Sequence, residues 1–124
     1  MKTSGLGVDG ERLAKEYLEA AGYRILEQNF ISRFGEIDII ATSERFLCFV
    51  EVKTRSSSNN LATGFESISL QKQQRIIKSA EYYLAIHARQ VEKAGLQPRF
   101  DCMEINVDEN DVNIRMIENA FCLE

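Results

Sequence analysis

Residues 35–55 read GEIDIIATSERFLCFVEVKTR and contain two segments rich in β-branched and aromatic residues, Glu36–Thr42 and Phe46–Thr54. Only Ser43-Glu44-Arg45 separates them. So short a connection between two segments of this type predicts a β-hairpin. The hairpin therefore fixes which residues of the two strands lie opposite one another, and the rest of the fold is expected to assemble around it.

The register expected for this turn separates the two faces of the hairpin. One face carries the apolar pairs Ala41/Cys48, Ile39/Val50 and Ile37/Val52. The other carries Thr42/Leu47 and Ile40/Phe49, followed by two charged pairs, Asp38/Glu51 and Glu36/Lys53. A slip of one residue would scatter the charges over both faces, which favours this register.

In this register Asp38 and Glu51 lie directly opposite, with Cβ atoms about 4.5–5.5 Å apart. Two carboxylates at that separation repel, so a shared proton, Lys53 or a divalent cation must compensate them. Mg²⁺ prefers oxygen ligands and is usually held by one or two carboxylates, water and substrate phosphate. Lys53 follows on the same face, about 6–7 Å along the strand, where an ammonium orients water or stabilises a phosphate. The other interpretation is that these charged residues simply face solvent.

Two helices are predicted from the spacing of apolar residues. Within 8–21, residues Ala14, Tyr17, Leu18 and Ala21 follow one helical face, and Gly22 favours a helix end. The second helix is expected to begin near Ser69, a good N-cap residue, and to end at Gly95. Its apolar stripe comprises Ile76, Ile77, Ala80, Tyr83, Leu84 and Val91.

Three further strands are predicted at Tyr23–Ile31, Arg99–Asp108 and Val112–Glu118, with a long loop from Ser56 past Gly64 before the second helix. The resulting order is helix, three strands, helix, two strands. This order predicts an α/β fold in which a mixed β-sheet is flanked by helices.

The chain has 124 residues, of which 44% are hydrophobic and 27% charged. This length and composition predict one globular domain spanning residues 1–124. No apolar run is long enough to cross a bilayer, and no signal peptide is evident. Cys48, Cys102 and Cys122 are odd in number and form no CxxC pair, which is typical of reduced thiols in a cytoplasmic protein.

The formal net charge is −4 and the isoelectric point is about 5.1. Nucleic-acid-binding proteins usually carry an excess of Lys and Arg, because phosphate contacts supply much of their affinity. A nucleic-acid site here must therefore depend on a local basic patch or a bound cation. Candidate residues are Arg33, Arg55, Lys72 and Arg75. The helical pair Lys72 and Arg75 also fits the solvated face of an amphipathic helix.

Motifs spread along most of the chain resemble the PD-(D/E)xK, restriction-endonuclease-like nuclease superfamily, and more closely the bacterial YraN family within it. Ile37 stands where the superfamily name has a proline, a departure that many members share. The motifs are Gly10-Glu11 with Ala14, Tyr17 and Leu18; Gly22-Tyr23; Asn29-Phe30; Gly35 to Asp38; Phe49 to Arg55; Lys72 with Arg75; and Arg99-Phe100-Asp101.

The resemblance implies that Asp38 and Glu51 are ligands of Mg²⁺, for which Mn²⁺ substitutes, and that Lys53 is the catalytic lysine. Glu11 resembles a helical acid that many superfamily members add to the catalytic site. Glu11 also fits a second interpretation, because a glutamate in the first turn of a helix interacts favourably with the helix dipole.

The resemblance implies a Mg²⁺-dependent endonuclease that hydrolyses phosphodiester bonds of nucleic acid, with DNA as the expected partner. Likeness to Holliday-junction resolvases extends this expectation to branched DNA and to a homodimer. The alternative is a catalytically silent module on a nuclease fold that binds nucleic acid or protein, which the acidic isoelectric point favours. A third hypothesis is a metal-dependent hydrolase of small phosphodiesters.

Overall fold

The structure, a computed structural model, describes residues 9–56 and 68–121. The predicted α/β fold and order of elements are confirmed, apart from one break in the second helix. In chain order the elements are α1 (Gly10–Ala20), β1 (Arg24–Ser32), β2 (Gly35–Thr42), β3 (Phe46–Ser56), α2 (Leu70–Ile86), α3 (Ala88–Ala94), β4 (Gln97–Val107) and β5 (Val112–Phe121). Most of the predicted loop before α2, and Cys122, lie outside the described residues.

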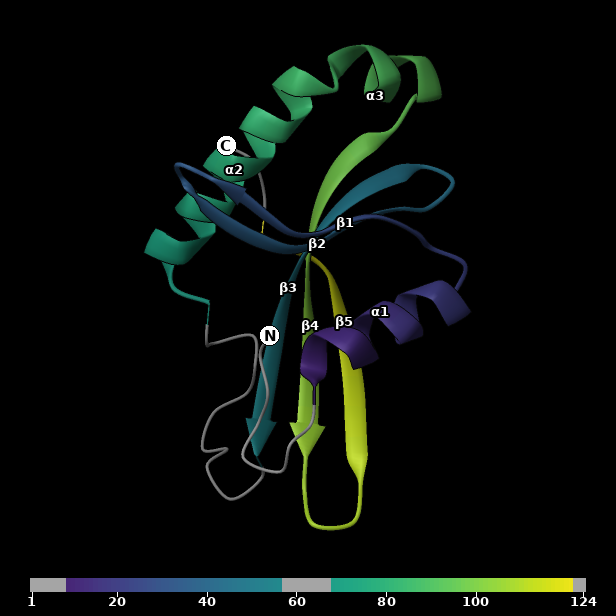
Figure 1. Cartoon of the computed structure of the whole chain (residues 1–124), viewed down its shortest axis with the longest axis vertical. Helices are drawn as coiled ribbons and strands as arrows, with labels where there is room; N and C mark the ends of the chain where they lie inside the picture. Colours follow the sequence, from purple (N-terminus) through teal and green to yellow (C-terminus); the bar gives the residue numbers. More distant parts are fainter. Residues whose placement is uncertain (1–8, 57–67, 122–124) are drawn as a thin grey trace.

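The five strands form one sheet in the order β1-β2-β3-β4-β5. Neighbouring strands are antiparallel except β3 and β4, which are parallel, so the sheet is mixed as predicted. A parallel pair needs a long crossover connection, and the segment containing α2 and α3 supplies it. Figure 1 shows α1 on one side of the twisted sheet and α2 with α3 on the other. Of the helices in the described ranges, none has the length and apolar character to span a membrane.

Two hydrophobic clusters fill the two faces of the sheet. On the α2 face, Ile40, Leu47 and Phe49 pack with residues of α2 such as Ile76 and Tyr83. On the α1 face, the cluster contains Ala14, Leu18, Ile39, Ala41, Cys48, Val50, Val52, Met103, Ile105 and Val107. The sheet is therefore covered on both sides, and a charged side chain on its central strands must be buried.

The second helix is broken, where the sequence predicted one continuous helix to Gly95. α2 ends at Ile86, His87 has non-helical torsions (φ −109°, ψ 23°), and α3 begins at Ala88. The His87 ring packs on Tyr83, with 4.2 Å between the ring centroids. Beyond the break Val91 packs against the cluster on the α2 face, and the predicted helix end at Gly95 is confirmed by its left-handed torsions.

The predicted hairpin register is confirmed over four pairs, from Ile39↔Val50 to Thr42↔Leu47. The predicted burial of Ile37 beside Ile39 on one face is wrong. Ile37 packs on the α2 face, whereas Ile39 packs on the α1 face. On β1, Asn29 lies between residues that pair with Ile37 and Ile39, and has a positive φ of 53°. The alternation of β2 therefore breaks at Asp38, next to this irregular residue.

A charged cluster joins β4 and β5 to Tyr23, the residue before β1. Arg99 donates from Nε and Nη2 to the carboxylate of Asp101, at 2.9 and 3.0 Å. Arg99 also donates to Tyr23 Oη at 2.8 Å, and Asp101 accepts from the backbone N–H of Asn119 at 2.9 Å. Because two N–H groups of Arg99 reach the Asp101 carboxylate, the ion pair is bidentate. Asp101 is fully buried, so the pair is also shielded from water. The Arg99-Phe100-Asp101 motif thus has a structural role in this chain.

We expect Asp101→Ala to lower the free energy of unfolding by about 3–5 kcal/mol, because it leaves the Arg99 guanidinium buried without its counter-ion. Tyr23→Phe removes a single hydrogen bond and is expected to cost about 1 kcal/mol. Urea unfolding followed by circular dichroism measures both. Equal losses in the two variants would contradict the assignment of Asp101 as the centre of this cluster.

Candidate functional site

A pocket of about 340 Å³ opens between β2, β3 and the first half of α2, and contains both predicted carboxylates. Asp38 comes from β2 and Glu51 from β3, and their exposed fractions are only 1% and 3%. Both acids therefore line one pocket, although the β2–β3 ladder ends at Ile39↔Val50 and does not include the predicted pairs Asp38/Glu51 and Glu36/Lys53. The residues lining the pocket are Gly35, Glu36, Asp38, Glu51, Lys72, Arg75 and Ile76.

The Asp38 carboxylate is held by the backbone of the neighbouring strand. Its Oδ2 accepts a hydrogen bond from the N–H of Val52 at 2.8 Å. The ladder between β2 and β3 runs from Thr42↔Leu47 to Ile39↔Val50, so this bond forms just beyond its end. The Asp38 carboxylate thus accepts a hydrogen bond that a backbone carbonyl of β2 would accept within the ladder. This bond fixes the orientation of the carboxylate toward Glu51.

Glu51 forms an ion pair with Lys72 of α2. Burial, and after it the neighbouring Asp38, raise the pKa of Glu51 from 4.5 to about 7, against the opposing effect of the Lys72 ammonium. Below about pH 7 Glu51 therefore holds a proton, and above it the Glu51 carboxylate is neutralised by the Lys72 ammonium. Shifts of this kind cluster at functional sites and also occur in structural ion pairs, and the burial of Glu51 excludes a solvent-facing glutamate.

Lys53 is half-buried on the same face of β3 as Glu51. Burial lowers its pKa, and the nearby Lys72 ammonium lowers it further. Among the described residues, those that line the pocket do not include Lys53. Lys53 therefore lies beside the acidic pocket and next to Lys72, rather than within it.

Glu11 is buried in the first turn of α1, which packs on the opposite face of the sheet from α2. Gly10 lies so close to Thr54 of β3 that a Cβ at this position would overlap the Thr54 hydroxyl. This contact places the start of α1 against the second half of β3. Glu11 is not among the described residues that line the pocket, so its role there stays a prediction.

Of the four predicted nucleic-acid-binding residues, the structure brings Lys72 and Arg75 to the pocket. Arg55 is half-buried near the end of β3. Arg33 is exposed in the turn between β1 and β2, with its guanidinium 4.9 Å from the centre of the Phe34 ring. The pocket lining therefore includes two of the four predicted residues.

The sequence did not predict the ion pair between Lys72 and Glu51, or the residues that border the pocket at the turn between β1 and β2. Gly35 lines the pocket with φ +145°, a conformation that favours glycine. The hydroxyls of Ser32 and Ser79 lie 2.9 Å apart in a hydrogen bond that fastens the turn to α2. The two serines are 47 residues apart, and no local sequence pattern indicates that they lie close together.

The donor set of the pocket fits a hard divalent cation. Asp38 and Glu51 supply carboxylate oxygens from adjacent strands, and Mg²⁺ commonly uses one or two carboxylates with water completing its shell. Within residues 9–56 and 68–121, no group of three or more His, Cys, Asp and Glu side chains is arranged to hold a metal. A cation here would therefore keep several positions for water or phosphate oxygens.

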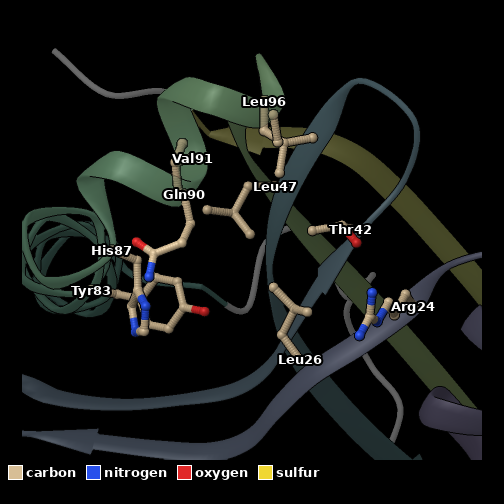
Figure 2. Close-up of a pocket in the computed structure, with 10 residues that line it drawn as sticks. Arg24, Leu26, Thr42, Leu47, Tyr83, His87, Gln90, Val91 and Leu96 are labelled. Atoms are coloured by element: carbon tan, nitrogen blue, oxygen red, sulfur yellow. The ribbon is translucent and has the colours of Figure 1, made fainter.

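A second pocket, of about 390 Å³, lies at the far end of α2 between α3 and the starts of β1 and β3. Figure 2 shows Leu26, Leu47 and Val91 around it, with the Tyr83 and His87 rings at one side. Its lining contains no carboxylate.

Both described cysteines, Cys48 and Cys102, are buried free thiols whose pKa values burial raises to about 12 and 11, so neither is a nucleophile.

The fold and pocket thus define an α/β protein with an acidic, cation-compatible site. The chain belongs to the uncharacterised protein family UPF0102, whose family model matches residues 10–105. It is 46% identical over 122 residues to a UPF0102 protein of Persephonella marina (95% of this chain, 94% of the relative). Identity is 42% over 123 residues to one of Caldicellulosiruptor bescii (98% and 100%), and 41% over 118 residues to one of Clostridium perfringens (94% and 93%).

We expect Glu51→Gln to raise the melting temperature of the metal-free protein by a few degrees at about pH 8, and by less at about pH 5. Because the pKa of Glu51 is raised to about 7, the folded protein binds a proton there that the unfolded chain releases above about pH 4.5. Wild-type stability therefore falls as pH rises through 7, and glutamine is spared this loss.

Thermal unfolding in EDTA at the two pH values measures the difference. Glu16→Gln, on the exposed side of α1, is the matched control and is expected to show no such pH dependence. A stabilisation of Glu51→Gln that is equal at both pH values would contradict the assigned protonation.

Proposed function

We propose that this protein is a Mg²⁺-dependent endonuclease of the PD-(D/E)xK type, which hydrolyses phosphodiester bonds of nucleic acid, with DNA as the expected substrate. The observation that carries the proposal is the burial of two carboxylates from adjacent strands in one pocket, next to basic residues of α2. Buried like charges are retained where a cation or a proton compensates them. The resemblance described above supplies the reaction class.

In the proposed reaction, Asp38 and Glu51 hold the cation. When bound, Mg²⁺ polarises the phosphoryl group and lowers the pKa of a coordinated water. Val52 keeps the Asp38 carboxylate aimed into the pocket through its N–H. Lys53 follows Glu51 on the same face of β3. There its ammonium orients the attacking water or stabilises charge developing on the phosphate.

Arg75 and Lys72 line the same pocket and offer cations to a phosphate that approaches the acids. The net charge of −4 means that binding must be local to this pocket and to the bound cation. Affinity for DNA should therefore be modest, and its dependence on salt should reflect the small number of phosphates contacted. Arg33 and Arg55 are proposed to contact the phosphates of the substrate outside the pocket.

The test is cleavage of linear and branched DNA, with RNA in parallel, in Mg²⁺ and in Mn²⁺. We expect Asp38→Asn, Glu51→Gln and Lys53→Ala each to lower the cleavage rate by about 100-fold or more, the size typical of losing a metal ligand or a charge-stabilising group. EDTA is expected to abolish cleavage.

Lys93→Met, in exposed α3, is the control and is expected to leave the rate unchanged. Activity that survives Asp38→Asn and Lys53→Ala would show that another protein cleaves the DNA. DNA binding in Ca²⁺ without cleavage in Mg²⁺ or Mn²⁺ would favour the silent binding module instead. Gel filtration with light scattering tests the expected homodimer.

A further inference from the structure

Lys72 occupies a position in the pocket that a bound cation would contest. Its ammonium pairs with Glu51, whose side chain is 3% exposed, while Lys72 itself is 39% exposed. In the metal-free protein the lysine therefore supplies the positive charge that this buried carboxylate requires. A divalent cation that binds Glu51 must share the carboxylate with Lys72 or displace it.

We infer that Lys72 has two successive partners: it neutralises Glu51 in the metal-free protein, and it moves to a substrate phosphate when a divalent cation takes its place. The inference rests on the proposed function, because it assumes that Asp38 and Glu51 hold the cation. It adds that binding of metal and binding of phosphate are coupled through one side chain.

The surroundings of Lys72 favour its release. Lys72 lies in the first turn of α2, which contains no acidic residue, so the helix dipole disfavours a cation there. The backbone N–H of Lys72 donates to the side chain of the cap residue Ser69 at 3.1 Å, which holds the backbone while the side chain extends to the pocket. The Lys53 ammonium lies close to that of Lys72. Glu51 is the partner that offsets these repulsions in the pocket.

A divalent cation on Glu51 reverses that balance. It brings two more positive charges next to Lys72 and takes over the carboxylate, so the ammonium is repelled from its partner. The long side chain of Lys72 is partly exposed and can turn toward the mouth of the pocket, where Arg75 also lies. There the two cations form a site for one phosphate, adjacent to the acids. The structure thus assigns Lys72 to phosphate contact only after the cation is bound.

The first experiment measures Mn²⁺ binding to the full chain by isothermal titration calorimetry, without nucleic acid. We expect Lys72→Met to bind Mn²⁺ about 5- to 10-fold more tightly than wild type, the factor that a charge pair with one buried partner produces. Lys93→Met removes the same charge from exposed α3 and is expected to change the affinity less than 2-fold. Lys72→Arg is expected to bind Mn²⁺ with nearly wild-type affinity.

The second experiment measures binding of a fluorescein-labelled DNA duplex in Ca²⁺ and in EDTA. The measured quantity is the ratio of DNA affinity in Ca²⁺ to DNA affinity in EDTA. This ratio is expected to be about 3 to 10 times larger in wild type than in Lys72→Met. Lys93→Met is expected to keep the wild-type response.

The outcomes separate the inference from the proposed function. Unchanged Mn²⁺ affinity in Lys72→Met, with binding still lost in Asp38→Asn, overturns the role of Lys72 and leaves the metal site intact. If wild type binds no Mn²⁺, or Asp38→Asn binds it as well as wild type, both the inference and the proposed site fail. Tighter Mn²⁺ binding together with a weaker Ca²⁺ effect on DNA supports the coupling.

Discussion

The hydrogen bond from the N–H of Val52 to Oδ2 of Asp38, 2.8 Å long, lies where β2 and β3 stop pairing with each other. At this point the last backbone ladder bond is succeeded by a bond to a side chain, and an aspartate can serve that purpose because it accepts from backbone N–H groups. As a result a carboxylate is buried among apolar strands and held in one orientation. Glu51 of β3 and Lys72 of α2 then complete the pocket around this fixed carboxylate.

Much of the fold was accessible from the sequence, because local signals coincide with the tertiary arrangement. The short connection at residues 43–45 fixed the register of β2 and β3, and Ser69 marked the start of α2. The break at His87 was not predictable, since residues 70–94 keep their apolar spacing through it. Val91 packs against the core on the α2 face after the break, as the continuous stripe also predicted. The reversal of Ile37 depends on the backbone of Asn29, a residue of a different strand.

The candidate site was predictable to the extent that it depends on one hairpin. Asp38 and Glu51 belong to neighbouring strands with a defined register, so their convergence follows from pairing alone. The other participants come from α2, which reaches the pocket only after a crossover that has no local signal. Lys72 was therefore recognisable as a basic residue but not as the partner of Glu51. For Glu11 the sequence motif is clear, but the motif does not indicate that α1 packs on the face of the sheet opposite α2.

The acidic net charge and the proposed action on nucleic acid are compatible because the pocket is not acidic as a whole. The pocket is lined by three acids, Glu36, Asp38 and Glu51, together with Lys72 and Arg75, and Lys53 lies beside it, so the positive groups balance the carboxylates before any cation binds. Binding of Mg²⁺ would then leave the pocket with excess positive charge. A pocket that becomes attractive to phosphate only after a cation binds needs no permanent basic surface. The low isoelectric point therefore argues against constitutive DNA binding rather than against a metal-dependent nuclease.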